Sequence, residues 1–341
     1  MIGSKTQLAC FAAIAGSLAL SNAASTASFD CAHAKSAREK LICGQPELSK
    51  LDEQLGRIYQ ERQVALSAHG AALLRRSELS WLHFVRVVCS PSRAPADNSD
   101  RPEDCLLKVY RERIGQLSKV GQKIGPFVFN RIDTYAVQRA SDSSGEMPGF
   151  YVAHVAYPQI DNSDSPQARA WNKLAERSLA MSNDGGDDGE NAADDGEDAS
   201  IDYEIGYASE RLISVQWTNS DYEHGAAHGT WEVSAQNIVL APNVRVLTTE
   251  DLFQKNGHWA GEIQNIFWRS LLANGWSTGD ESVKDEIRNE VVRPHRWLFT
   301  RDGLQVSFGA YEGGCYACNP GTATAHWTEL KPFLSSAAVA P

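Results

Sequence analysis

The stretch CGQPELSKLDEQLGRIY, residues 43–59, decides the fold of the first part of the chain. Pro46 suits the first position of a helix, where its missing N–H costs nothing. After it, apolar residues recur at spacings of three and four: Leu48, Leu51, Leu55, Ile58 and Tyr59. This single apolar stripe predicts an amphipathic helix that must bury one face against a neighbour.

Two further helices are predicted downstream. One runs from about 71 to 88 and places Leu74, Trp81, Val85 and Val88 on one side. The stretch PSRAPADNSDRPED (91–104) interrupts it, and a third stripe begins near Cys105 with Leu106, Val109, Tyr110, Ile114 and Leu117. Three such stripes bury one another as a small helical bundle.

From about residue 125 the pattern changes to strands. Alternating runs appear in FYVAHVAYPQI (150–160), DYEIGYASERLISVQW (202–217), GTWEVSAQNIVL (229–240), RWLFTRDGLQVSFGAY (296–311) and TATAHW (322–327). Helices are expected at 165–181 and 259–274, with no regular βαβ alternation. The predicted fold class is α+β: an N-terminal disulfide-stapled helical bundle, then an antiparallel sheet with helices packed on one face.

The first residues have the layout of a cleavable secretory signal, assigned to 1–27. Lys5 precedes an apolar run from Leu8 to Leu20, and small residues follow. A lipoprotein cysteine at Cys10 is the weaker alternative, because most of the apolar run lies after this cysteine rather than before it. No later run approaches the ~18 apolar residues of a membrane span, so a soluble periplasmic or secreted protein is expected.

Six cysteines remain after the signal, and an even number in an oxidising compartment indicates disulfides. Of three possible connectivities for the first four, Cys31–Cys43 with Cys89–Cys105 is the most economical. Cys315 and Cys318, in YEGGCYACNP (311–320), are interpreted as a short-range disulfide that fixes a turn. Two alternatives for this pair are a redox role and a zinc site, the latter completed by His326 or by His224 and His228.

The charge distribution favours a basic partner. The formal net charge is −11, which argues against nucleic acid and anionic membranes. Nine Asp and Glu residues fall within 184–202, and an EF-hand alignment of this run fails at two ligand positions. The run is interpreted as a solvated loop over 183–202, with an electrostatic lure for a cationic enzyme as the functional alternative.

Motifs of common enzyme classes are absent: GxSxG, HExxH, a P-loop and the dinucleotide fingerprint are all missing. His224 and His228 lie in EHGAAH between glycines, so a packed turn is expected rather than a metal pair. The sequence therefore predicts a non-enzymatic protein with no metal and no cofactor.

Three segments together resemble the LprI-type domain, a small exported helical module named for a lysozyme inhibitor. They are FDCAHAKSAREKLICGQPELSKLDEQLGRIY (29–59), SELSWLHFVRVVC (77–89) and CLLKVYRERIGQL (105–117). Four cysteines, the LDxxL helix and the WxxxxxxxC spacing fall in order. The family commonly has arginine four residues after the tryptophan; here Val85 occupies that position and Arg86 follows.

The remainder, about 150–334, is similar to the extracellular region of RsiV-like proteins. The matching segments are YPQI (157–160), WNKL (171–174), HGAAHGTWEV (224–233), LTTEDLF (247–253) and LFTRDGLQVSFGAYEGGCYACNPGTATAHWTEL (298–330). A resemblance to that family implies that the protein binds lysozyme and thereby regulates a sigma factor. The chain lacks a predicted membrane helix, so the signalling arrangement does not carry over.

The sequence is thus interpreted as a signal (1–27), an LprI-like helical domain (28–120), a linker with a lead strand (121–149) and an RsiV-like α+β domain (150–335). The expected function is capture and inhibition of a basic lysozyme-like muramidase in the cell envelope. A cell-wall-glycan enzyme, a zinc protein, or a module that binds another bacterial protein are the alternatives. Candidate partner-binding residues are Tyr311, Glu312, Tyr316, His224 and His228.

Overall fold

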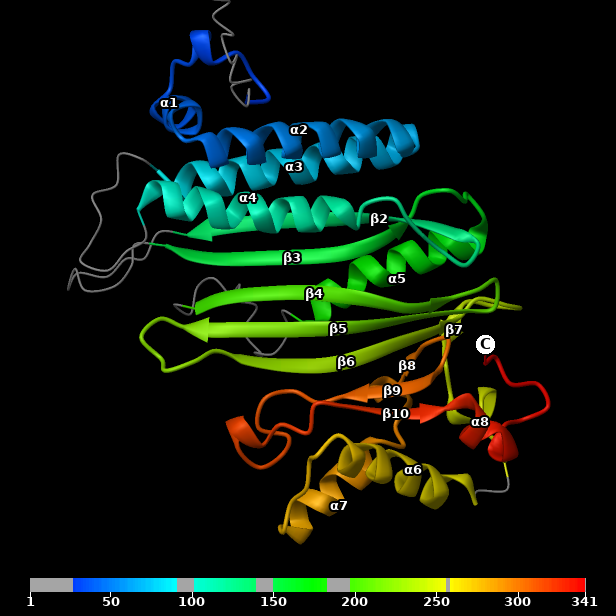
Figure 1. The fold of residues 1–341 in the computed structure, drawn as a ribbon. Coiled ribbons are helices and arrows are strands. Elements are labelled where there is room, and N and C mark those ends of the chain that lie inside the picture. Colours follow the sequence, from blue (N-terminus) through cyan, green and yellow to red (C-terminus); the bar gives the residue numbers. More distant parts are fainter. Residues whose placement is uncertain (1–26, 91–100, 139–149, 183–196, 256–257, 341) are drawn as a thin grey trace, which may run out of the picture.

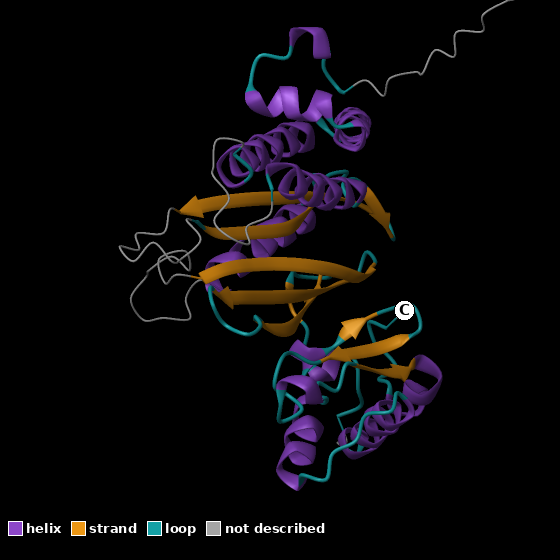
Figure 2. Cartoon of the chain, turned by 60° about the vertical axis from the view of Figure 1, so that its left-hand side comes forward, coloured by secondary structure: helices purple, strands orange, loops and turns teal. Residues whose placement is uncertain are grey.

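A computed structural model describes residues 27–90, 101–138, 150–182, 197–255 and 258–340, without the side chains of 177–182. The signal assigned to 1–27 lies outside these residues except for its last position. In the described part of the chain, no helix is long and apolar enough to cross a membrane. The elements form three layers: a helical module, a seven-stranded sheet, and a small sheet with its own helices (Figures 1 and 2).

The helical module contains η1 (Cys31–His33), α1 (Ala37–Gly44), α2 (Pro46–Ala65), α3 (Ala68–Val88) and α4 (Pro102–Ser118). The predicted stripes bury one another, and Leu48, Leu74, Leu106 and Leu117 are completely buried. Caps set the boundaries: α2 and α4 begin with proline, and Ser67 Oγ accepts a hydrogen bond from the Gly70 N–H at the start of α3. The three predicted helices are confirmed.

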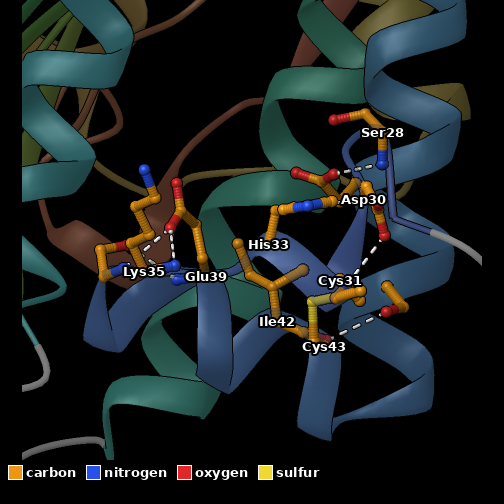
Figure 3. The surroundings of a disulfide bond; sticks show 12 residues. Ser28, Asp30, Cys31, His33, Lys35, Glu39, Ile42 and Cys43 are labelled. Atoms are coloured by element: carbon orange, nitrogen blue, oxygen red, sulfur yellow. Dashed lines mark hydrogen bonds and ion pairs between the residues drawn. A yellow bond between two sulfur atoms is a disulfide. The ribbon is translucent and has the colours of Figure 1, made fainter.

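Helix α1 is an addition to the prediction. Its eight residues carry little apolar periodicity, but Ser36 and Glu39 form a reciprocal capping box at its start. The Glu39 carboxylate also accepts a hydrogen bond from the Lys35 N–H at 2.7 Å. Figure 3 shows this cap beside the disulfide that ties Cys31 of η1 to Cys43 of α1.

All three predicted disulfides are present. Cys31–Cys43, Cys89–Cys105 and Cys315–Cys318 join α-carbons 5.7, 5.6 and 4.9 Å apart. The second bridge closes the connection between α3 and α4, whose residues 91–100 lie outside the described part of the chain. Loop closure of this length stabilises a fold by about 2–4 kcal/mol.

The seven-stranded sheet has its strands in chain order, from β1 to β7. They are β1 (Gln122–Ile124), β2 (Phe127–Gln138), β3 (Tyr151–Ile160), β4 (Glu197–Ala208), β5 (Leu212–Glu223), β6 (Thr230–Val239) and β7 (Arg245–Val246). All neighbours pair antiparallel except β3 and β4, which run parallel. The parallel pair is possible because α5 (Pro166–Ser182) provides a helical crossover between them.

The last part of the chain builds a three-stranded antiparallel sheet in the order β10-β9-β8. Its strands are β8 (Leu298–Phe299), β9 (Gly303–Ser307) and β10 (Thr322–His326). Around them lie α6 (Trp259–Ala273), α7 (Glu281–Glu290), α8 (Trp327–Leu330) and the short helices η3 (Thr249–Asp251), η4 (Pro294–Arg296), η5 (Tyr316–Cys318) and η6 (Lys331–Phe333). This layer has its own apolar core, which includes Phe267, Trp297 and Phe299.

Three expectations about this region need correction, although the α+β class is confirmed. The main sheet is mixed rather than purely antiparallel. The main sheet is not covered by helices alone: α5 packs through Trp171 against Phe129, whereas Leu212 and Val239 share an apolar core with the small sheet. The expected acidic loop 183–202 ends early, because residues 197–202 belong to β4; residues 183–196 lie outside the described part.

Candidate functional site

Two segments singled out in the sequence meet in space. The His228 ring stacks on Tyr316 with centroids 3.6 Å apart, although one follows β5 and the other lies in η5. Trp231 meets the Tyr316 ring edge-on at 5.5 Å, and Tyr311 lies 5.7 Å from it. We call His228, Trp231, Tyr311 and Tyr316 the aromatic cluster. Tyr311 is 50% exposed, so the cluster offers an aromatic side chain to solvent.

The turn 311–319 is held rigidly around its disulfide. A Cβ on Gly313 would lie 2.0 Å from the Cys318 carbonyl oxygen, so only glycine fits there. Trp276 Nε1 donates to that same oxygen at 2.6 Å, and Asn319 Nδ2 donates to the Phe308 carbonyl at 3.0 Å. The aromatic side chains therefore stand on a preorganised backbone, which lowers the entropic cost of binding.

Glu312 is turned toward the protein. Its Oε2 accepts hydrogen bonds from Arg296 Nη2 at 2.8 Å and from the Gly309 N–H. Arg296 is 9% exposed and also donates to the carbonyls of Val233 and Ser307. Glu312 thus anchors the turn to the sheet, and this arrangement supports the neighbouring tyrosines.

His224 lies apart from the aromatic cluster. Its side chain is 7% exposed, and Nε2 lies 3.0 Å from Asp198 Oδ2. The rings of Tyr151 and Tyr222 flank it at 5.0 and 5.8 Å. His228 Nδ1 donates to the Gly229 carbonyl at 3.2 Å, so the two histidines point to different partners. Their contacts are those of packed turn residues.

A cleft of about 630 Å³ adjoins the aromatic cluster. Residues of α3 and α4 form one wall, and strands β2 to β6 form the other. Tyr316 and Trp231 lie where the cleft meets the cluster. The helical module and the sheet therefore share a single concave surface.

A buried ionic network connects the helical wall of the cleft to the sheet wall. Arg113 of α4 donates to Glu78 Oε2 of α3 and to Asp133 Oδ2 of β2, each at 3.0 Å. Arg131 Nε donates to Asp133 Oδ1 at 2.9 Å, and His154 Nε2 lies 3.1 Å from the same oxygen. The side chains of Arg113 and Asp133 are both fully buried. Glu78, Arg113, Arg131, Asp133 and His154 constitute what we call the ionic network.

The protonation states of the network follow from its contacts. Burial alone would raise the pKa of Asp133, but the hydrogen bond from His154 and the charges of Arg131 and Arg113 outweigh it and hold that pKa at about 2. For Glu78 the loss of hydration outweighs the charge and hydrogen bond of Arg113, so burial raises the pKa of this carboxyl group. Burial also raises the pKa of the Tyr135 hydroxyl next to the network.

The zinc alternative for Cys315 and Cys318 loses its basis. Both sulfurs are joined in the disulfide, so neither is a thiolate ligand. Residue His326 instead caps α8. Within the described ranges, no group of three or more His, Cys, Asp or Glu side chains is arranged to hold a metal ion.

Several residues that build the site were not singled out in the sequence. In the sequence, Trp231 and Arg296 lie in alternating runs that predict strands, and nothing in those runs distinguishes them from other sheet residues. The signal for Trp231 was its position in the HGAAHGTWEV segment, three residues beyond His228. Arg113 carried no signal, because arginine in a helix normally faces solvent.

Comparisons with solved structures find remote neighbours. A DUF3298 family protein from Pseudomonas aeruginosa PAO1 is 15% identical, with a TM-score of 0.42 over 62% of this chain and 96% of that one. A member of the same family from Bacteroides fragilis NCTC 9343 is 17% identical, with a TM-score of 0.41 over 63% of this chain and 96% of that one.

Among curated proteins, two homoserine kinases of Prochlorococcus marinus match over 91 residues. They are 31% identical in strain CCMP1986 and 30% identical in strain MIT 9515. Each match covers 26% of this chain and 29% of the relative. The chain thus spans less than a third of the length of these relatives.

A family model gives the most direct comparison. The model described as "Lysozyme inhibitor LprI" matches residues 31–117, the segment that runs from η1 into the last turn of α4 and includes the first two disulfides. Over residues 31–117 this chain is therefore similar to the LprI family.

Proposed function

We propose that this protein is an exported envelope protein that binds a lysozyme-type muramidase and inhibits it. The observation that carries the proposal is the match of residues 31–117 to the lysozyme inhibitor family. The resemblance of 150–334 to RsiV-like proteins adds a second sequence link to lysozyme. We further propose that 28–120 and 150–335 are the two functional modules, and that neither catalyses a reaction.

Charge supports the choice of partner. The chain carries a formal net charge of −11, and opposite net charges raise the association rate of two proteins. A basic muramidase would therefore be attracted at low ionic strength. Screening by salt should slow its association.

The aromatic cluster is the proposed contact surface. Interface hot spots are enriched in tryptophan and tyrosine, which bury a large area at little cost in conformational entropy. Tyr311 adopts a positive φ of 65° and is half exposed, next to a turn that a disulfide and Glu312 hold in place. Such a turn is suited to enter the cleft of an enzyme.

The proposal is tested by titrating residues 28–341 against hen-type and goose-type lysozymes at low and physiological salt, with muramidase activity followed in the same samples. Stoichiometric binding with loss of activity of at least one class is expected. Binding without loss of activity would replace inhibition with sensing. Absence of binding to both classes would refute the proposed function.

Tyr316→Ala should weaken lysozyme binding by about 30-fold, the effect of a hot spot worth about 2 kcal/mol. The substitution removes the ring that contacts His228, Trp231 and Tyr311. Calorimetric titration measures the change. Tyr316→Phe keeps the ring and is the matched control, with an expected change below about threefold. Equal affinities for Tyr316→Ala and the parent chain would remove the cluster from the interface.

A further inference from the structure

The cleft between the helical module and the sheet has an unbalanced charge. Three carboxylates line it, Glu112 from α4, Asp198 from β4 and Asp221 from β5, whereas Lys108 is the sole lysine or arginine among the described residues that line it. His154 also lines it, but this ring is bound to Asp133. A negative potential in a concave, partly apolar surface favours a positively charged ligand.

Two of these carboxylates have no cationic partner among the described residues. Both oxygens of Asp221 accept only from the Thr230 hydroxyl, at 3.0 and 2.8 Å. Glu112 is exposed and forms no ion pair with any described residue. Asp198 is already committed, because it contacts His224 and accepts from the Val152 N–H. Glu112 and Asp221 are thus available to bind an incoming cation.

Aromatic rings line both ends of the cleft. At one end Phe84 stacks on Tyr135 at 4.9 Å, and Tyr135 stacks on His154 at 4.4 Å. At the other end Trp231 and Tyr316 belong to the aromatic cluster. Guanidinium and ammonium groups bind to the faces of such rings, and more strongly in a partly desolvated site.

We propose that this cleft receives arginine or lysine side chains from a surface loop of the basic partner. The inference rests on the proposed function and deepens it: the LprI domain and the sheet contribute to one interface, with Glu112 and Asp221 on opposite walls. The volume of about 630 Å³ is in the range of preformed ligand pockets and accommodates more than one side chain. Charge complementarity selects a cationic protein segment over a neutral ligand.

The ionic network explains why the cleft is preformed. Arg113 and Asp133 tie α4 to β2 through a fully buried pair, and Ser80 Oγ accepts from the Tyr135 N–H at 2.8 Å. The two walls therefore keep their spacing in the absence of a ligand. Binding then costs little conformational entropy.

The test compares two variants that are expected to change the affinity for lysozyme in opposite directions. E112Q/D221N should weaken lysozyme binding about tenfold or more, because it removes both available charges, while K108A should strengthen it about two- to fivefold. E262Q/D285N, which neutralises two exposed carboxylates of α6 and α7 outside the cleft, is the matched control and should change affinity less than about twofold. Thermal unfolding verifies that all three variants fold.

If the parent chain binds lysozyme and E112Q/D221N binds equally well, the cleft assignment is wrong and the proposed function stands. If the parent chain binds no lysozyme, the proposed function fails, and an acetylated Arg-Gly-Arg amide peptide tests the cleft alone through tryptophan fluorescence. Saturable quenching that E112Q/D221N abolishes would uphold a cation-binding cleft. Quenching by a neutral chitooligosaccharide, with none by the peptide, would overturn it in favour of a glycan site.

Discussion

Asp133→Asn is expected to lower the free energy of unfolding of residues 28–341 by about 3–5 kcal/mol, the cost of removing one partner from a buried ionic group. The amide keeps the shape of the carboxylate but loses its charge. Arg113 then retains Glu78, and Arg131 retains Asp202 at 2.6 Å. Two arginines would still have lost the fully buried carboxylate between them.

The matched control is Asp285→Asn, which neutralises an exposed carboxylate on α7 and should change stability by less than about 0.5 kcal/mol. Urea unfolding followed by circular dichroism measures both. If Asp133→Asn unfolds at the same urea concentration as the parent chain, the network contributes specificity of fold rather than stability.

The pH dependence of folding stability is a second test of the role of Asp133. The pKa of Asp133 is lowered to about 2 in the folded chain, from about 3.9 in an unfolded one. A lowered pKa contributes stability that is fully present above the unfolded value and is lost as pH falls toward the folded value. The difference in stability between the parent chain and Asp133→Asn should therefore shrink between about pH 4 and pH 2.

Trp81→Ala is expected to cost about 3–5 kcal/mol, the range for removing a large aromatic ring from a core. Trp81 is 2% exposed, meets the Tyr110 ring edge-on at 5.3 Å, and has the Arg113 guanidinium 6.0 Å from its ring centroid. The cavity would open between α3 and α4, beside the ionic network. Thermal unfolding of the purified variant measures the loss.

Leu79→Ala is the control on the same helix. Leu79 is 57% exposed, so its truncation should change stability by less than about 0.5 kcal/mol. Because the network bonds the helical module to β2, Trp81→Ala should lower a single transition. Two separate transitions, with the sheet unaffected, would show that the modules unfold independently.

The helices were predictable where periodicity was strong. The apolar stripes of α2, α3 and α4 continue over several turns, and the predicted proline start of α2 agrees with the structure. Helices α1 and α7 were missed, since they have eight and ten residues and are rich in charged side chains. A short charged helix resembles a loop in composition, so its caps are its main local signal.

The candidate site was predictable only in part. Tyr311, Tyr316 and His228 attracted notice through local features, the Cys-x-x-Cys turn and the histidine spacing, and the structure brings them together. Glu312 was expected to face a partner, yet it binds Arg296, which lies on another element. Such a pairing depends on the position of η4 against the turn, and nothing in the sequence near Glu312 encodes it.

The sequence by itself determined the α+β class, the main helices and the three disulfides, because these depend on residues close together in the chain. Only the tertiary structure decided the parallel pairing of β3 with β4, the burial of Arg113 and the cleft between the modules. Each arises from contacts between distant segments. The physical reason is that an arginine is placed in a core only when carboxylates from other elements, here Glu78 and Asp133, offset its loss of hydration.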